Sequence, residues 1–291
     1  MAGAGRSSIG STKGDVVAKQ KLTSNAGAVV TGAGSGIGRA FALELARRGG
    51  RVVCSDINLA SARETVALIE ADGGAATAVQ TDVSDLAQVE ALAIEAERWL
   101  ESPIDVVINN AGVGAGGSRV GDTTMDDWKW VLGVNLWGVI HGCHVFTPRL
   151  RAQRRGGIIN VGSTASFAAA PTMGPYNVSK SAVLALTETM AAEFQGSGLH
   201  ITALCPTFVK TNIVRDGRIA GSATGFADKI MKWTGIEAEG VARLTLDALD
   251  RNQLYVLPQL DARTIWRMKR LAPSLYARGA GVLNRLLAAK S

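Results

Sequence analysis

The feature of this sequence that most constrains its fold is an alternation of short apolar runs with longer segments of helical patterning. Runs such as DVVIN are apolar at almost every position, which is typical of strands buried on both faces. Strands that alternate with helices of about ten or more residues form a parallel sheet covered by helices on both faces. We therefore expect a single-domain, doubly wound α/β fold. The expected strands are 26–31, 51–56, 75–82, 105–112, 157–163, 200–206 and 254–258, and the expected helices are 39–48, 59–71, 86–100, 125–154 and 176–195.

Three segments follow from this pattern. Residues 26–258 form the expected domain, because no boundary interrupts the pattern and no internal repeat divides it. Residues 1–25 lack the apolar stretch of a secretory signal, and we expect a flexible leader there. Residues 259–291 hold seven basic residues and one acidic residue, with apolar residues at broadly helical spacing. We expect a basic amphipathic C-terminal extension, which packs on the body or on a neighbouring subunit, or contacts an anionic membrane surface.

The composition bounds the class of protein further. Apolar residues make up 47% of the chain and charged residues 19%, so a sizeable core can form. The net charge is +6, of which the two end segments carry +3 and +6 and the body −3, and this argues against a nucleic-acid-binding core. The three cysteines, Cys54, Cys143 and Cys205, form no CxxC pair, which favours a reducing compartment. No apolar run approaches the roughly 18 residues of a membrane span, so we expect a cytoplasmic protein.

A glycine-rich turn, TGAGSGIG at residues 31–38, joins the first expected strand to the first helix. Gly32 permits a tight turn, Gly36 lets the backbone approach a pyrophosphate, and Gly38 lets helix and strand pack closely. The start of the helix then offers unpaired N–H groups and a positive dipole end to the phosphates. Glycine clusters also make ordinary turns, but the position between strand and helix favours a dinucleotide site. We assign Gly32, Ser35, Gly36, Ile37 and Gly38 to that site.

Asp56 ends the second expected strand, 20 residues beyond Gly36. A carboxylate there accepts hydrogen bonds from the adenosine ribose hydroxyls and repels a 2′-phosphate. Ser35 and Ile57 bring no positive charge to offset it, although Arg39 is close by on the helix. The sequence therefore favours NAD over NADP as the cofactor. The alternative is that Asp56 is only a solvated acid at the end of a strand.

A tyrosine and a lysine in YNVSK suggest proton-transfer chemistry. Tyr176 and Lys180 are four residues apart, so they lie on one face of a helix. A free phenol has a pKa near 10, and a nearby ammonium lowers it. Tyr176 can then exchange a proton with an alcohol or a carbonyl oxygen. Ser163 closes the expected strand 157–163 and can hydrogen-bond the same oxygen.

These motifs together resemble the short-chain dehydrogenase/reductase family. TGAGSGIG, NNAG at 109–112, Asn135 in GVNLWG, Ser163 and YNVSK match its Asn-Ser-Tyr-Lys subclass in identity, order and spacing, over about residues 26–258. The resemblance implies a Rossmann-like fold and an enzyme that acts on CH–OH groups with NAD as acceptor. It implies a homodimer or homotetramer paired through the helices at about 123–153 and 176–197.

The resemblance also implies a role for each matched residue. Ser163 would orient the substrate oxygen, and Tyr176 would be the general acid/base. Lys180 would lower the pKa of Tyr176 and bind the nicotinamide ribose, while Asn135 would hold a water of the proton relay. The other implied cofactor contacts are Asp82 and Val83 at the adenine, Asn109, Ala111 and Gly112 beside the central strands, and Pro206, Val209 and Thr211 at the nicotinamide.

One position departs from the family pattern. CPTFVKT resembles the segment PGxxxT, which holds the nicotinamide, but Thr207 stands where the family has glycine. The departure places a β-branched side chain near the nicotinamide and changes the expected local geometry and substrate shape.

The remaining features bear on the substrate and on other readings of the chain. His141 and His144 lack the further ligands of a metal site, and we expect no metal there. The apolar residues that border the expected cleft favour a small hydrophobic substrate, a secondary alcohol or its ketone or aldehyde, or else they cover the core. The alternative to an enzyme is a non-catalytic NAD-binding protein with a redox-sensing or scaffold role. The bordering residues are Phe167, Met173, Ile213, Phe226, Ile230, Met231 and Trp233.

Overall fold

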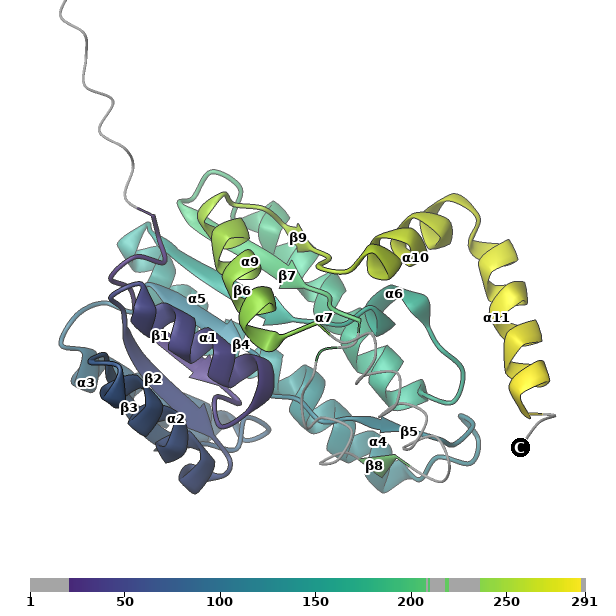
Figure 1. The fold of residues 1–291 in the computed structure, drawn as a ribbon, viewed down its shortest axis with the longest axis horizontal. Coiled ribbons are helices and arrows are strands. Elements are labelled where there is room, and N and C mark those ends of the chain that lie inside the picture. Colours follow the sequence, from purple (N-terminus) through teal and green to yellow (C-terminus); the bar gives the residue numbers. More distant parts are fainter. Residues whose placement is uncertain (1–20, 208, 210–217, 220–235, 289–291) are drawn as a thin grey trace, which may run out of the picture.

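The computed structural model in Figure 1 describes residues 21–207, 209, 218–219 and 236–288. Seven parallel strands form its main sheet in the order β3-β2-β1-β4-β6-β7-β9. The expected doubly wound parallel sheet is therefore confirmed. The strands are β1 (Gly27–Thr31), β2 (Arg51–Asp56), β3 (Ala75–Gln80), β4 (Val106–Asn109), β6 (Gly156–Val161), β7 (Leu199–Leu204) and β9 (Tyr255–Val256).

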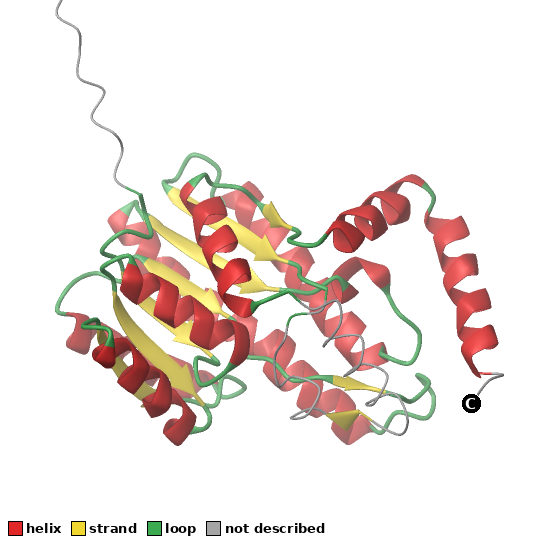
Figure 2. Cartoon of the chain, viewed as in Figure 1, coloured by secondary structure: helices red, strands yellow, loops and turns green. Residues whose placement is uncertain are grey.

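Successive apolar residues of the central strands enter two different cores. In β1, Val30 packs into one core and Val29 into the other, and both are fully buried. This alternation explains why the strands are apolar at nearly every position. Helices cover both faces of the sheet (Figure 2). One core takes α1 (Gly36–Arg47), α2 (Leu59–Ala71) and α9 (Ala238–Asp250), and the other takes α3 (Leu86–Leu100), α5 (Gly138–Gln153) and α7 (Gly174–Glu193).

Several elements differ from the expected ones. The segment 125–154 is divided into α4 (Met125–Leu132), a π-helical turn η1 (Gly133–Trp137) and α5. α9 was not expected, although its buried residues, among them Val241, Leu246 and Leu249, recur at helical spacing. Some elements were not expected because they are too short to show a periodic pattern in the sequence. They are α6 (Ala165–Ala168) and the two-stranded sheet of β5 (Ala115–Gly116) and β8 (Arg218–Ile219).

The described part of the expected leader packs on the body. Leu22 and Thr23 are buried. The Thr23 N–H and hydroxyl donate to Asp250 at 2.9 and 2.8 Å, and Arg48 donates to the Thr23 hydroxyl at 2.9 Å. The packed part of the chain therefore begins before residue 26, because these bonds tie the start of β1 to the end of α9.

The C-terminal extension forms two helices, α10 (Leu260–Leu271) and α11 (Pro273–Ala288), that reach away from the sheet in Figure 1. Pro273, which interrupts the expected helical pattern, is the first residue of α11. Its missing N–H costs nothing there, because the first N–H groups of a helix have no partner inside it. Of the described helices, none is both long and apolar enough to span a bilayer.

Candidate active site

The site begins where the order of the strands reverses. β1 and β4 are neighbours, although the chain forms β2 and β3 between them, so the loops after β1 and β4 diverge from a common point. Ligands of open α/β sheets bind at such a point. The Thr31 hydroxyl accepts hydrogen bonds from the N–H groups of Asn110 at 3.0 Å and Ala111 at 3.1 Å, and the Asn110 amide donates to the Thr31 carbonyl at 2.9 Å. The two loops are thus held together.

The glycine-rich turn needs glycine for two distinct reasons. Gly32 has φ +63°, a left-handed conformation that favours glycine, and a Cβ there would stand 2.8 Å from the Ala111 Cα. A Cβ on Gly38 would stand 2.0 Å from the Gly32 carbonyl oxygen, so no side chain fits between α1 and the turn. Ser35 is the N-cap of α1, is exposed, and makes no capping hydrogen bond with its side chain. The first turn of α1 holds no acidic residue, so its positive end stays available to an anion.

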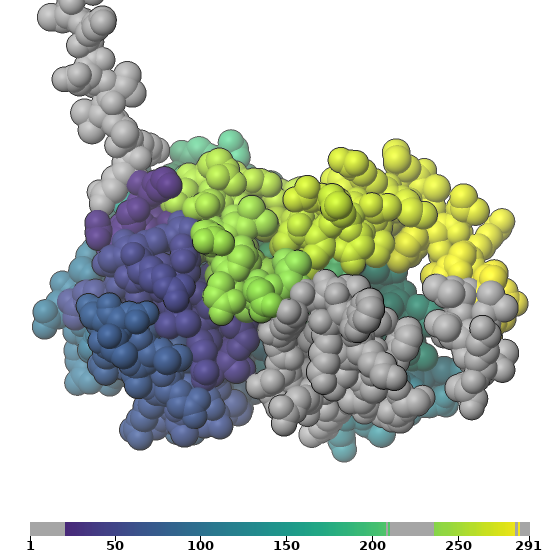
Figure 3. Space-filling model, viewed as in Figure 1, coloured from purple at the N-terminus to yellow at the C-terminus, as the bar shows by residue number. Residues whose placement is uncertain are grey.

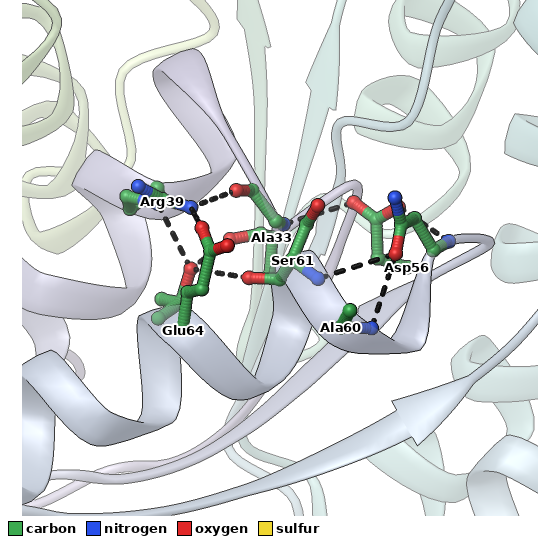
Figure 4. Close-up of polar contacts among 9 residues, drawn as sticks. Ala33, Arg39, Asp56, Ala60, Ser61 and Glu64 are labelled. Atoms are coloured by element: carbon green, nitrogen blue, oxygen red, sulfur yellow. Dashed lines mark hydrogen bonds and ion pairs between the residues drawn. The ribbon is translucent and has the colours of Figure 1, made fainter.

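Asp56 faces the same turn (Figure 4). Its carboxylate accepts hydrogen bonds from the N–H groups of Gly34 and Asn58, each at 2.9 Å. The Arg39 guanidinium is held beside α2, where it pairs with Glu64 at 3.0 Å and also donates to Thr65 and to the Gly34 carbonyl. Arg39, the cation considered above as a neighbour of Asp56, is therefore engaged by other partners.

Ser163, Tyr176 and Lys180 meet beyond the end of β6. The Ser163 side chain lies close enough to the Tyr176 phenol to lower its pKa. The Lys180 ammonium lies 5.9 Å from the centre of the Tyr176 ring and donates to the Val161 carbonyl at 2.8 Å. The hydroxyl of Ser166, in α6, donates to the Lys180 carbonyl at 2.7 Å and so fixes the helix that carries both residues.

The protonation of this group differs from the sequence expectation. Burial raises the pKa of Tyr176, while the hydrogen bond with Ser163 lowers it, and the net change is upward. The net upward change differs from the expected lowering, because removal of water from the phenolate is its largest cause. Burial also lowers the pKa of Lys180 to about 8, so that the ammonium remains the main form at neutral pH.

Asn135 lies in the π-helical turn between α4 and α5, and such turns are frequent at functional sites. Its side-chain oxygen accepts from the Val113 N–H at 2.7 Å, and its amide donates to the Val113 carbonyl at 2.9 Å. A Cβ on Gly112 would stand 3.2 Å from the Asn135 oxygen and 3.5 Å from the Lys180 ammonium nitrogen. Asn135, Gly112 and Lys180 are thus brought together, and the Asn135 side chain is hydrogen-bonded to the Val113 backbone.

The other expected cofactor residues lie around this group in different ways. Asp82 and Val83 follow β3, where the Asp82 carboxylate accepts from Ser84 and the Val83 carbonyl bonds the His141 ring at 2.9 Å. The Asn109 side chain instead points into the interior and donates to Asn160 at 2.8 Å, because it ends a strand that is buried on both faces.

The segment after β7 is only partly within the described residues. The Pro206 carbonyl accepts from the Thr164 N–H at 2.8 Å, and Val209 is buried in the core beneath α9. Phe167 packs on a small cluster with Leu184 and Cys205, so it covers the core. The expected residues that lie outside the described part of the chain are Thr211, Ile213, Phe226, Ile230, Met231 and Trp233.

The cysteines and histidines take structural places. All three cysteines are free and buried. Burial raises the pKa of the Cys205 thiol to about 12, which keeps it protonated beside Lys180. In the described part of the chain, no three His, Cys, Asp or Glu side chains gather as metal ligands would. The sequence does not indicate the parts played by Thr31, which anchors the site through its hydroxyl, and by Val113, which does so through its backbone.

Comparison with known proteins agrees with this geometry. Residues 26–220 match the family model described as short chain dehydrogenase, and the chain belongs to that family. It is 34% identical over 256 residues to a 1-deoxy-11-beta-hydroxypentalenate dehydrogenase of Streptomyces exfoliatus, covering 84% of this chain and 90% of that relative. A crystal structure of a short chain dehydrogenase/reductase from Burkholderia phymatum in complex with NAD has a TM-score of 0.78 and 37% identity, and the match covers 85% of this chain and 94% of that one.

A further relative is much longer than this chain. The probable oxidoreductase EphD of Mycobacterium tuberculosis is 44% identical over 188 residues, which cover 64% of this chain. The match spans only 31% of the length of EphD.

Proposed function

We propose that this protein is an NAD(H)-dependent dehydrogenase that interconverts an alcohol and its ketone or aldehyde. The observation that carries the proposal is the convergence of Ser163, Tyr176 and Lys180 beyond the end of β6, with Lys180 next to Gly112, in a chain of the short-chain dehydrogenase family. The relative from Streptomyces exfoliatus is named as a dehydrogenase of a hydroxylated compound, and the structure from Burkholderia phymatum holds NAD. Both support the assignment.

The chain's own residues fit NAD. The cradle formed by Gly32 and Gly38 has no room for a Cβ, and the free N-cap Ser35 opens the positive end of α1 to the pyrophosphate. Asp56 would accept the ribose hydroxyls. A 2′-phosphate would meet the Asp56 carboxylate without a free cation from Arg39, so NAD is favoured over NADP. We assign Gly36, Ile37, Asp82, Val83, Ala111, Gly112, Pro206, Val209 and Thr211 to the same cofactor.

When bound, NAD supplies a hydride acceptor. Ser163 hydrogen-bonds the substrate oxygen, and Tyr176 takes the hydroxyl proton during oxidation or returns it during reduction. Because burial alone raises the pKa of Tyr176, the phenolate needs positive charge close by. Lys180, whose pKa is about 8, provides that charge at neutral pH. A relay water would be held at Asn135, whose side chain is fixed by the Val113 backbone.

A hydrophobic secondary alcohol, or its ketone, is the proposed substrate. Met173 and Val120 bring apolar atoms to the loops that precede Tyr176, with Val120 lying against Gly174. A homodimer or homotetramer is also proposed. Trp137 on η1 and Val178 on α7 are large exposed apolar residues on the helices expected to pair subunits.

One assay tests the proposal. Formation of NADH is followed with a panel of hydrophobic secondary alcohols, and NAD binding is measured in parallel by calorimetry. Turnover of at least one alcohol is expected. Binding of NAD without oxidation of any alcohol or reduction of any corresponding ketone would support the non-catalytic redox-sensing or scaffold role instead.

A further inference from the structure

The two helices after β9 form a basic arm, Leu260–Ala288, at one end of the molecule (Figure 3). α10 packs against α6, with Ala262 fully buried at its root. Among the described elements, α11 packs chiefly against α10. The described part of the body therefore leaves much of the arm uncovered.

Large apolar side chains along the arm face solvent. Leu271 is 85% exposed and Leu275 is 71% exposed, and these residues stand on either side of the bend between α10 and α11. Met268 and Val282 are also exposed. Leu275 and Val282 are seven residues apart in α11, so they lie on one face of the helix. Isolated exposed leucines are common, but a row of them along an arm indicates a binding surface.

Arginines border the apolar face. Arg278 and Arg285 are exposed, and each follows an exposed apolar residue of α11 by three positions, so each lies next to it on the helix surface. The arm holds six basic residues and one acidic residue, a net charge of +5, whereas the body carries −3. An apolar stripe bordered by cations is typical of a helix that lies in the interface of an anionic bilayer.

We propose that the basic arm docks this protein on the surface of an anionic lipid bilayer. Leu271, Leu275 and Val282 enter the acyl region, and the arginines stay at the level of the lipid phosphates. None of the described helices can cross a bilayer, so the arm lies along the surface. Pairing with the arm of a second copy would juxtapose two segments of +5, which like-charge repulsion disfavours.

Sedimentation of the full chain with lipid vesicles tests this docking. The chain is expected to bind vesicles of equal parts phosphatidylglycerol and phosphatidylcholine, to leave phosphatidylcholine vesicles unbound, and to dissociate as salt rises. Arg278→Gln and Arg285→Gln should each weaken binding about fivefold, and together about 25-fold. Leu275→Ser with Val282→Ser should also abolish most binding. Ile94→Ser is the matched control, because Ile94 is 62% exposed on α3, outside the arm, and its loss should change nothing.

Two results would overturn the proposal. One is equal sedimentation of the wild type and the double arginine variant with anionic vesicles, including the case in which neither binds. The other is a fall in oligomer mass, measured by light scattering without lipid, in the Leu275→Ser/Val282→Ser variant. That fall would identify the arm as an interface between subunits.

Independent contacts link the root of the arm to the segment after Ser163. The Thr207 hydroxyl donates to the Asp261 carboxylate at 3.1 Å and lies 3.0 Å from the Thr164 hydroxyl. Because Thr207 donates to Asp261, Thr164 is the donor to Thr207. The Thr207 N–H donates to the Gln259 side chain at 3.1 Å. Glycine, the residue that the family pattern has here, would make neither hydroxyl contact.

We infer that Thr207 is a positioning residue for the active site, an inference that rests on the proposed function. The row Thr164–Thr207–Asp261 fixes the backbone next to Ser163, whose hydroxyl accepts from the Ala165 N–H at 3.1 Å. Ser163 must be held in place because, in the proposed function, its hydroxyl hydrogen-bonds the substrate oxygen next to Tyr176. The Thr207 hydroxyl thus makes two contacts that glycine, the residue of the family pattern, cannot make.

Paired variants separate this role from a general loss of folding. Thr207→Val should lower kcat about tenfold, the effect of one lost hydrogen bond, with the KM for NAD unchanged. Thr207→Ser should restore kcat. Amide hydrogen exchange of residues 163–166 should be faster in Thr207→Val than in Thr207→Ser, which reports on the contact even if no substrate is turned over. Unchanged kcat and unchanged exchange in Thr207→Val, or failure of serine to restore either, would overturn the inference.

Discussion

Replacement of Lys180 by methionine should change how the stability of the protein depends on pH. Lys180 is 3% exposed, and burial lowers its pKa from 10.5 to about 8. Because the folded state has the lower pKa, the unfolded chain binds more protons between about pH 8 and 10.5. The wild-type protein therefore gains stability from Lys180 as the pH rises through this window. Methionine keeps the length of the side chain and removes the titration.

The magnitude follows from the two pKa values. Their difference corresponds to about 3 kcal/mol of unfolding free energy, of which about 2.5 kcal/mol develops between pH 7 and pH 10. Burial raises the pKa of Cys54, Cys143 and Cys205 to about 12, which lowers stability above pH 9. These thiols are present in both proteins, so their effect cancels in the comparison to first order.

The assay is urea unfolding of the wild type and Lys180→Met at pH 7, 8, 9 and 10 without added cofactor. The difference between the two unfolding free energies should shift by about 2.5 kcal/mol in favour of the wild type from pH 7 to pH 10. A difference that stays constant over this range would refute the reasoning, because it would mean that Lys180 is not desolvated in the folded protein.

Three further substitutions test other parts of the account. Asp56→Ala should weaken NADH binding about tenfold or more and reduce the preference over NADPH, as measured by cofactor fluorescence, whereas tighter binding of NADPH by the wild type would contradict the assignment. Gly38→Ala should destabilise the protein by about 1–3 kcal/mol and abolish NAD binding, because the new Cβ meets the Gly32 carbonyl; an unchanged affinity for NAD would show that the turn is not the cradle. Phe146→Ala, on the buried face of α5, should cost about 3–5 kcal/mol in urea unfolding without changing the cofactor preference.

The sheet could be predicted from sequence because its strands carry a strong signal. Val29 and Val30 both need to be apolar, since each enters a core on its own side of the sheet. Asp56 could be placed at the turn because the end of β2 and the end of β1 lie at one edge of a parallel sheet. Such patterns can be recognised in the sequence because the burial of each residue follows from its position along its own strand.

Other features depend on contacts that are distant in sequence. The break at η1 puts Asn135 against the Val113 backbone, and nothing near Asn135 in the sequence indicates that partner. The raised pKa of Tyr176 could not be predicted, because burial is a property of the assembled site, while the spacing to Lys180 is a local one. Asn109 belongs to the NNAG motif, yet its side chain turns to Asn160 on the neighbouring strand. A one-dimensional pattern does not say which face a strand-end residue takes.

In the proposed reaction, Tyr176 exchanges the substrate proton while NAD exchanges the hydride. This role of Tyr176 is tested most directly by comparing NADH formation by the wild type and Tyr176→Phe with one accepted alcohol, at saturating NAD. The account predicts a fall of about 100- to 10,000-fold in the rate, with the affinity for NAD nearly unchanged. A rate that survives the substitution intact would contradict the account.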